Sequence, residues 1–250
     1  MPLRVVLIGL AALALFVVPA AVDFAADWLW FGELGYRRIY STEITTRAAT
    51  GLAAFLLTVA WLSMNVRLAL QAISPAPLTF TTREGFTVAL PTRDQVRPLI
   101  LVVAAVASFL VASVVSAQWM TLLAWWQQVP FNVNDPVLGY DAAFYVFTLP
   151  MLEMARGVLF GLIVLALAGA AGLYFVAGQV TLTPFGLRVE DRARAHLTWL
   201  AAGGFLVLAL GAWLSRVQEI VNASGIIQGA SYADVHARMP AALALTVAAL

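Results

Sequence analysis

Side chains able to do chemistry are few in this sequence, and the best candidates are two aspartates. Asp135 and Asp141 lie in the stretch from Pro130 to Leu152, PFNVNDPVLGYDAAFYVFTLPML. A carboxylate acts in catalysis only when a second acid, a base or a metal converges on it. The nearest partners, Glu153 and Arg156, are better explained as the boundary of a membrane span. We therefore expect no catalytic, cofactor-binding or metal-binding residue here.

The same stretch has the residue types of an ordered turn. Pro136 fixes one φ angle, and Gly139 permits a conformation that other residues resist. The side chains of Asp135 and Asp141 can accept hydrogen bonds from nearby backbone N–H groups. We expect these four residues to form a rigid extracytoplasmic loop with a structural or docking role. Rings expected at the adjoining membrane interface are Phe144 and Tyr145.

Other reactive groups are isolated. His196 follows Glu190 and Asp191 at the end of a predicted span, where a boundary histidine is the ordinary interpretation. Asp234 and His236 lie two residues apart, but a metal pair there would lack further ligands. The sequence has neither Cys nor Lys, which excludes a disulfide, a thiol nucleophile and a Schiff-base lysine within these residues. We expect no cofactor, and a non-enzymatic role is favoured over an enzyme.

Composition indicates which elements must position these residues. Of the 250 residues, 62% are hydrophobic and 11% are charged, whereas soluble domains carry about 25% charged residues. The apolar residues form long uninterrupted blocks, which is typical of membrane spans. The net charge of +1 and the absence of a basic run argue against nucleic acid as a partner. We predict an all-α, polytopic transmembrane helix bundle.

Charge-free stretches place the spans, because an Arg or Asp at the bilayer centre costs roughly 2.5–3.5 kcal/mol. We predict a single transmembrane domain over residues 1–250, with five complete spans and a truncated sixth. The predicted spans are 5–22, 48–66, 98–123, 157–178 and 196–215, with an incomplete one at 240–250. Aromatic extracytoplasmic connectors are expected at 23–47 and 124–156. Because the last span is too short to cross, we expect a fragment of a longer protein.

The N-terminal segment allows two interpretations. The run from Val5 to Val22 is apolar enough for a retained span, whereas Arg4 and the Val18–Ala20 tripeptide also fit a cleaved secretory signal. We favour the span, because its apolar run is longer than a usual signal core. Arginines are more numerous beside the connectors that become cytoplasmic if the N-terminus is inside. We therefore predict a cytoplasmic N-terminus.

Aromatic residues fill the first connector. At helical spacing, Phe24, Trp28 and Phe31 share one face, which fits an amphipathic helix lying in the outer interface. The alternative is a docking surface for an extracytoplasmic domain. A different connector, from Gln71 to Pro91, is rich in Thr and has a possible turn at Glu84–Gly85, so we expect a small hairpin there.

Small and polar residues mark the sides of some spans. The GxxxG pair Gly157 and Gly161 suggests close helix packing, with a dimer seam as the alternative. The third span has a polar side, for which hydrogen bonding between helices is favoured over a pore lining. Its members are Ser108, Ser113, Ser116 and Gln118.

A resemblance rests on three motifs. The stretch from Phe131 to Pro150 resembles the pattern F-x-x-x-D-P-x-F-x-x-D-x-x-F-Y-x-F-x-L-P, with Leu138 in place of the usual aromatic residue. Its matching residues are Phe131, Asp135, Pro136, Asp141, Phe144, Tyr145, Phe147, Leu149 and Pro150. DWLWFGELGY at 27–36 and SYADVHARMPA at 231–241 also resemble the UPF0182 family of uncharacterised bacterial multi-pass membrane proteins. The similarity covers nearly the whole chain.

The resemblance implies a longer plasma-membrane protein, with about seven N-terminal spans before a large extracytoplasmic part, and brings no established activity. We expect a membrane module that anchors and orients that part within a cell-envelope assembly. Expected partners are the lipid bilayer, the C-terminal part and envelope proteins. A transporter or channel component is the alternative, followed by a membrane-embedded enzyme acting on lipid or envelope substrates. Substrate and oligomeric state stay open.

Overall fold

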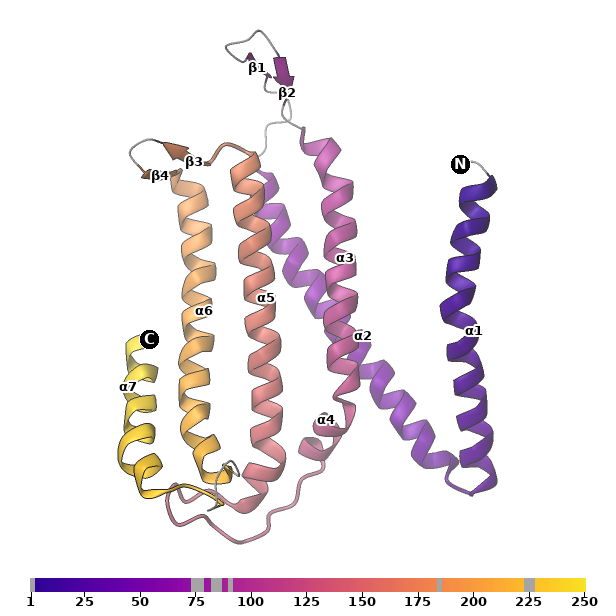
Figure 1. Ribbon diagram of the computed structural model, residues 1–250, viewed down its shortest axis with the longest axis vertical. Helices are drawn as coiled ribbons and strands as arrows, with labels where there is room; N and C mark the ends of the chain where they lie inside the picture. Colours follow the sequence, from indigo (N-terminus) through magenta and orange to yellow (C-terminus); the bar gives the residue numbers. More distant parts are fainter. Residues whose placement is uncertain (1–2, 73–78, 82–86, 90–91, 184–185, 223–227) are drawn as a thin grey trace. The chain divides into compact units, whose positions relative to one another are not determined.

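The computed structural model describes residues 3–72, 79–81, 87–89, 92–183, 186–222 and 228–250, and it is mainly α-helical (Figure 1). The α-helices are α1 (Leu3–Glu33), α2 (Arg37–Leu70), α3 (Arg93–Ala117), α4 (Trp119–Trp126), α5 (Leu149–Val176), α6 (Asp191–Gln218) and α7 (Met239–Ala249). Three single-turn segments are the π-helices η1 (Phe144–Thr148) and η3 (Asp234–Arg238) and the 3₁₀-helix η2 (Glu219–Val221). The predicted all-α class is confirmed.

Four helical segments of the described chain are long and apolar enough to cross a bilayer. These segments are Arg37–Leu70, Arg93–Ala117, Phe144–Val176 and Asp191–Val221. They contain the predicted second to fifth spans, apart from the last residues of the third and of the fourth. The predicted first span lies in α1 and the incomplete sixth overlaps α7, neither of which is among the four. The full number of crossings stays a prediction.

Helix boundaries differ from those of the charge-free runs. The third predicted span, 98–123, is interrupted at Gln118, where α3 ends and the short α4 begins. The helical segment that holds the fourth span begins at Phe144, well before residue 157, so Glu153 and Arg156 lie inside a helix. A charged residue excludes the bilayer centre but not the helical conformation, because its side chain is hydrated where the helix leaves the hydrocarbon. Charge therefore locates spans better than it locates helix ends.

The described chain divides into two compact units, Met1–Ala49 and Thr50–Leu250. In the first, the expected interfacial helix is not a separate element, because α1 continues without a break to Glu33. Only Leu34 to Tyr36 separate α1 from α2, with Gly35 at φ 77° in the turn. Positive φ is a conformation that glycine adopts without strain.

The aromatic face of α1 covers a tyrosine of α2. Tyr40 is buried, with its ring centroid 5.1 Å from that of Phe31 in a stacked arrangement. The rings of Phe24 and Trp28 lie 6.1 and 6.4 Å from it. Such ring contacts contribute about 0.5–1.5 kcal/mol each beyond area burial. The shared face found in the sequence therefore packs against the start of the next helix.

In the second unit, α6 packs between α5 and α7, as Figure 1 shows. Small residues allow the close approach: Ala166 and Ala170 of α5 and Ala193 of α6 are buried in one apolar cluster with Leu62. A second cluster joins the opposite ends of α5 and α6, and its buried members are Tyr145, Leu149, Leu214 and Val217. Packing of small residues is the usual means of helix association in lipid.

Two antiparallel hairpins connect helices of the second unit. β1 (Thr79–Thr81) pairs with β2 (Thr87–Ala89) between α2 and α3, in register Phe80 to Val88. The expected hairpin in this connector is therefore present, although its predicted turn at Glu84–Gly85 lies outside the described residues. The second hairpin, β3 (Val180–Thr183) with β4 (Gly186–Val189), links α5 to α6 and was not expected from the sequence.

α5 and α7 begin in the same way, with a π-turn before a proline. In each, a π-turn precedes the helix, and the residue before a proline donates its N–H to a carbonyl five residues back: Leu149 to Phe144, and Met239 to Asp234. Pro150 and Pro240 follow directly. A proline has no N–H, and its ring clashes with the carbonyl four residues back. A wider turn relieves that clash, which explains why both π-turns stand at this position.

The expected contacts of the small and polar residues within spans differ from those observed. A Cβ added at Gly157 or Gly161 would meet no described atom within 4 Å, so this pair makes no close contact within the described residues, although its span does pack against the next one, α5 against α6. Ser108 and Ser113 donate to Ala104 O and Phe109 O of their own helix, at 2.7 and 2.8 Å. Serine hydroxyls in helices often donate to a backbone carbonyl of the preceding turn. These two serines therefore contribute no bond between helices.

Candidate functional site

Asp135 organises the loop that joins α4 to η1. Its Oδ1 accepts hydrogen bonds from the backbone N–H groups of Val137 and Leu138, both at 2.8 Å. Its Oδ2 accepts from the N–H of Tyr140 at 3.1 Å and from the hydroxyl of Tyr145 at 2.5 Å. The main chain closes the same ring, since Asp135 N donates to Tyr140 O at 2.9 Å. The carboxylate is thus the centre of a small folded loop.

Gly139 makes this closure possible. Its φ is 76°, and its N–H donates to Asp135 O at 3.1 Å. A side chain at that position would strain the backbone even though an added Cβ would meet open space. Pro136 stands in the same turn, where its fixed φ reduces the freedom of the unfolded loop. The structure therefore brings together Asp135, Pro136 and Gly139 of the predicted loop.

Asp141 fixes the two ends of the loop to each other. Its Oδ1 accepts from Ala143 N at 2.7 Å, as a helix cap does, and from Phe131 N at 3.0 Å. Beside it, Ala142 N donates to Val133 O at 2.8 Å. Asp141 therefore joins the start of η1 to the chain ten residues earlier.

Both carboxylates are held in the charged form. Burial alone would raise the pKa of Asp135, but the hydrogen bonds from Tyr145, Leu138, Val137 and Tyr140 together lower it. The pKa of Asp141 is lowered by the N–H groups of Ala143 and Phe131. A general acid or base near neutral pH needs the opposite shift, towards 7. These carboxylates are suited to holding a loop, not to transferring protons.

Aromatic rings join this loop to the helix ends. Tyr140 stacks on Phe144 with centroids 4.6 Å apart, and Tyr145 is buried against Leu214 and Val217 of α6. Thr148 donates to the Gln128 side chain at 2.9 Å, beside an open hollow of about 260 Å³. Of the two predicted interfacial rings, Tyr145 therefore lies in the core, where its hydroxyl meets Asp135. No residue pattern in the sequence predicts that contact.

The start of α7 repeats the arrangement with different residues. Ser231 N donates to Asp234 Oδ2 at 2.8 Å, and Asp234 N to Ser231 Oγ at 3.3 Å, a reciprocal cap. Arg238 lies 3.1 Å from Asp234 and 3.6 Å from Glu219. The hydroxyl and N–H of Ser231, more than Arg238, lower the pKa of Asp234. His236 instead stacks on Tyr232, with centroids 3.9 Å apart.

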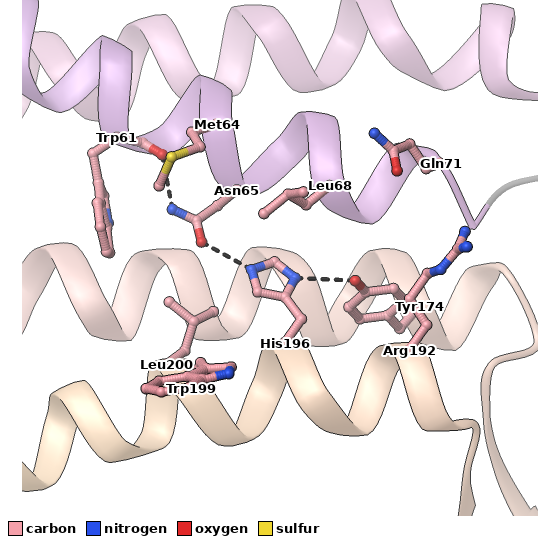
Figure 2. Close-up of a pocket in the computed structure, with 10 residues that line it drawn as sticks. All are labelled: Trp61, Met64, Asn65, Leu68, Gln71, Tyr174, Arg192, His196, Trp199 and Leu200. Carbon is pink, nitrogen blue, oxygen red and sulfur yellow. Dashed lines mark hydrogen bonds between the residues drawn. The ribbon is translucent and has the colours of Figure 1, made fainter.

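A hydrogen-bonded chain at the other end of the second unit escaped the sequence analysis (Figure 2). Tyr174 of α5 bonds His196 Nδ1 at 3.0 Å, and His196 Nε2 lies 3.0 Å from Asn65 Oδ1 of α2. Asn65 in turn donates from Nδ2 to Trp61 O at 2.8 Å. Because its Oδ1 must then accept, the pattern fits a neutral ring with its proton on Nε2. His196 thus links three helices.

The sequence contains one indication of these hydrogen bonds between helices. Thr58 and Asn65 stand seven residues apart in an apolar run, on one helical face, and both are buried. The second span therefore has a polar side as well as the third. Buried polar groups need partners, which directs attention to His196 near the end of another span.

The model of an uncharacterised protein family, UPF0182, matches residues 4–250. The chain belongs to the UPF0182 family. It is 35% identical over 244 residues to a UPF0182 protein of Geobacter sulfurreducens, covering 94% of this chain and 27% of the relative. It is also 34% identical over 225 residues to one of Kocuria rhizophila, covering 89% and 22%. No solved structure matches.

This UPF0182 chain spans about a quarter of the length of the curated relatives that it matches. The three motifs that carried the resemblance lie at helix ends and turns: at the end of α1 with the turn to α2, in the Asp135 loop with η1, and at the start of α7. In two of them an acidic side chain holds a helix start and a proline follows the π-turn. The motif residues of these two therefore have a shared structural explanation.

Proposed function

We propose that this part of the UPF0182 protein is a multi-pass module of the bacterial plasma membrane that anchors and orients a large extracytoplasmic part of the same protein, within a cell-envelope assembly. In this proposal five complete spans cross the bilayer and a sixth begins at residue 240, the N-terminus is cytoplasmic, and the Asp135 loop faces outward. The observation that carries it is the state of Asp135, whose two oxygens are occupied by four donors of its own loop.

A rigid loop suits an anchoring role. Asp135 fixes the centre of its backbone and Asp141 joins its two ends, so little entropy is lost when another domain binds it. The loop carries exposed apolar side chains, namely Val129, Phe131, Val133 and Val137. Exposed apolar groups on an ordered loop favour contact with a partner surface or with the lipid interface.

A photocrosslinking experiment tests the orientation role in the full-length protein. A photoreactive amino acid at Val133, which is 64% exposed, should crosslink to the extracytoplasmic part or to an envelope protein. The variant Asp135→Ala, which opens the loop, should lower the yield at least threefold at equal protein level. The matched control is Leu187 in β4, which is 63% exposed and should give no such product. Crosslinks from Val133 to lipid alone would contradict the docking role.

Asparagine variants separate structure from catalysis. Asp135→Asn and Asp141→Asn keep the size of the side chain and much of its capping ability but remove the charge and the capacity to act as a base. We expect any activity of the full-length protein to persist in both. Normal accumulation of either variant together with complete loss of that activity would make the loop a catalytic site.

A further inference from the structure

The chain of Asn65, His196 and Tyr174 forms one wall of a pocket of about 470 Å³ (Figure 2). Asn65 and Tyr174 are 4% and 1% exposed, so the wall is fixed within the helix packing. Both ring nitrogens of His196 are already engaged by these two residues. The pocket therefore has a preformed polar wall and falls within the usual size range of small-molecule sites, about 300–1,000 Å³.

The pocket is polar at one end and aromatic at the other. Figure 2 shows Gln71 and Arg192 together at one side of the pocket, with Trp61 and Trp199 at the opposite side. Gln71 directly follows the last residue of α2, and Arg192 is the second residue of α6. Trp61 and Trp199 lie about 15 and 10 Å further along those helices, at about 1.5 Å per residue. The polarity thus runs from the helix ends into the apolar spans.

Arg192 gives the polar end a positive charge that the described residues do not neutralise. The two neighbouring arginines have partners: Arg188 lies 3.4 Å from Glu190, and Arg194 lies 2.7 Å from Asp191. Among the described residues Arg192 has no ion pair, and no carboxylate lines the pocket. A planar guanidinium matches two oxygens of a phosphate.

The opposite end offers hydrocarbon contact. Trp199 is 79% exposed, and Met64 and Leu68 of α2 are also exposed beside it. Exposed apolar side chains on a span face the acyl chains of lipids, whereas a soluble phosphate would gain nothing from them. A ligand that uses the whole pocket must combine an anionic head with an apolar tail.

We propose that this pocket binds one acidic phospholipid, with the phosphate on Arg192 and Gln71 and an acyl chain along Trp199 and Leu68. The hydrogen-bonded wall of Asn65, His196 and Tyr174 holds α2, α5 and α6 at the spacing that the lipid needs. This site rests on the membrane placement given under Proposed function, but not on the direction in which the spans cross. Basic pockets between spans are an established means of recognising acidic head groups.

Native mass spectrometry of the full-length protein in detergent tests the site. Phosphatidylglycerol and phosphatidylcholine with identical acyl chains are titrated against wild type, R192Q and R194Q. Wild type should bind phosphatidylglycerol more tightly, and R192Q should lower that affinity about fivefold, the contribution of one arginine near an anionic surface. R194Q removes a charge two residues away that is already paired, and it should change the affinity less than twofold.

Two further measurements distinguish a lipid phosphate from a free phosphate ion as the ligand. Inorganic phosphate at 10-fold the lipid concentration should displace no phosphatidylglycerol, and W199A should weaken both lipids equally. Displacement by inorganic phosphate would make this a site for a soluble anion and overturn the lipid assignment. Equal losses in R192Q and R194Q would show diffuse charge attraction and also overturn it. A reversed topology would contradict the proposed function but leave these affinities unchanged.

Discussion

At the scale of single residues, the two aspartates that were the best candidates for catalysis accept hydrogen bonds from backbone N–H groups. Asp135 binds three N–H groups and a tyrosine hydroxyl, and Asp141 binds two N–H groups across ten residues. A carboxylate surrounded by donors is stabilised in its charged form, which raises the free energy needed to open the loop at neutral pH.

The lowered pKa values predict how the loop responds to acid. A folded pKa below the unfolded value of about 3.9 gives stability that is present above that pH and is lost as the pH falls through the folded pKa. The N–H groups of Val137, Leu138 and Ala143 should therefore keep their protection from hydrogen exchange from pH 7 to about pH 5. Protection should fall below about pH 4, after correction for the intrinsic exchange rate.

Asp135→Asn serves as the control for that measurement. It should lower protection at Val137 and Leu138 at every pH and remove the acid transition there, while Ala143, held by Asp141, keeps its transition. Loss of protection between pH 7 and pH 5 would show that a different group controls the loop.

At the scale of elements, the form of a helix start depends on a proline that follows the first, wider turn. Pro150 and Pro240 each follow a π-turn, and each turn is preceded by a polar cap, Asp141 in one case and Ser231 in the other. The π-turn determines which residues face inward, because it adds a residue to one turn. Because of this wider turn, the hydroxyl of Tyr145 reaches the carboxylate of Asp135.

Pro150→Ala should disturb the loop from a distance. Alanine restores an N–H that can donate to Val146 O, so the π-turn can close to an ordinary α-turn and rotate Tyr145 away from Asp135. Hydrogen-exchange protection at Val137 and Leu138 should then fall about tenfold, as expected for loss of a hydrogen bond to a charged group. Pro240→Ala makes the same change at α7 and should leave these two groups unchanged. Equal effects of both variants would indicate general destabilisation.

Much of the helical fold could be predicted from composition, but less of the site could be. Long charge-free runs determine where helices can lie in lipid, and Gly139 with Pro136 determines a turn from local conformational limits alone. The bond between Tyr145 and Asp135 depends on the π-turn, and Pro150 indicates where such a turn can stand but not which side chains it brings together. The partnership of Asn65 with His196 depends on which faces of α2 and α6 meet, and one sequence contains no information on pairing.

At the scale of the whole molecule, the predicted direction of crossing is testable because the chain has no native cysteine. In whole cells expressing the full-length protein without other cysteines, Val133→Cys should react with an impermeant maleimide, whereas Leu187→Cys should not. Both side chains are similarly exposed, at 64% and 63%, so access to the reagent and not burial decides the result. Labelling of Leu187→Cys alone would reverse the topology.

The hydrogen bonds of His196 determine how the packing of α2, α5 and α6 responds to voltage and to salt. Three helices are joined by an amide, an imidazole and a phenol, and the hydrogen-bond pattern assigns none of them a charge. A transmembrane voltage exerts force only on charges, at about 2.3 kcal/mol per charge per 100 mV, so it cannot pull this joint apart. Ionic strength cannot weaken it by screening either. If the module spans the membrane as proposed, these hydrogen bonds should therefore hold equally well in energised and de-energised cells.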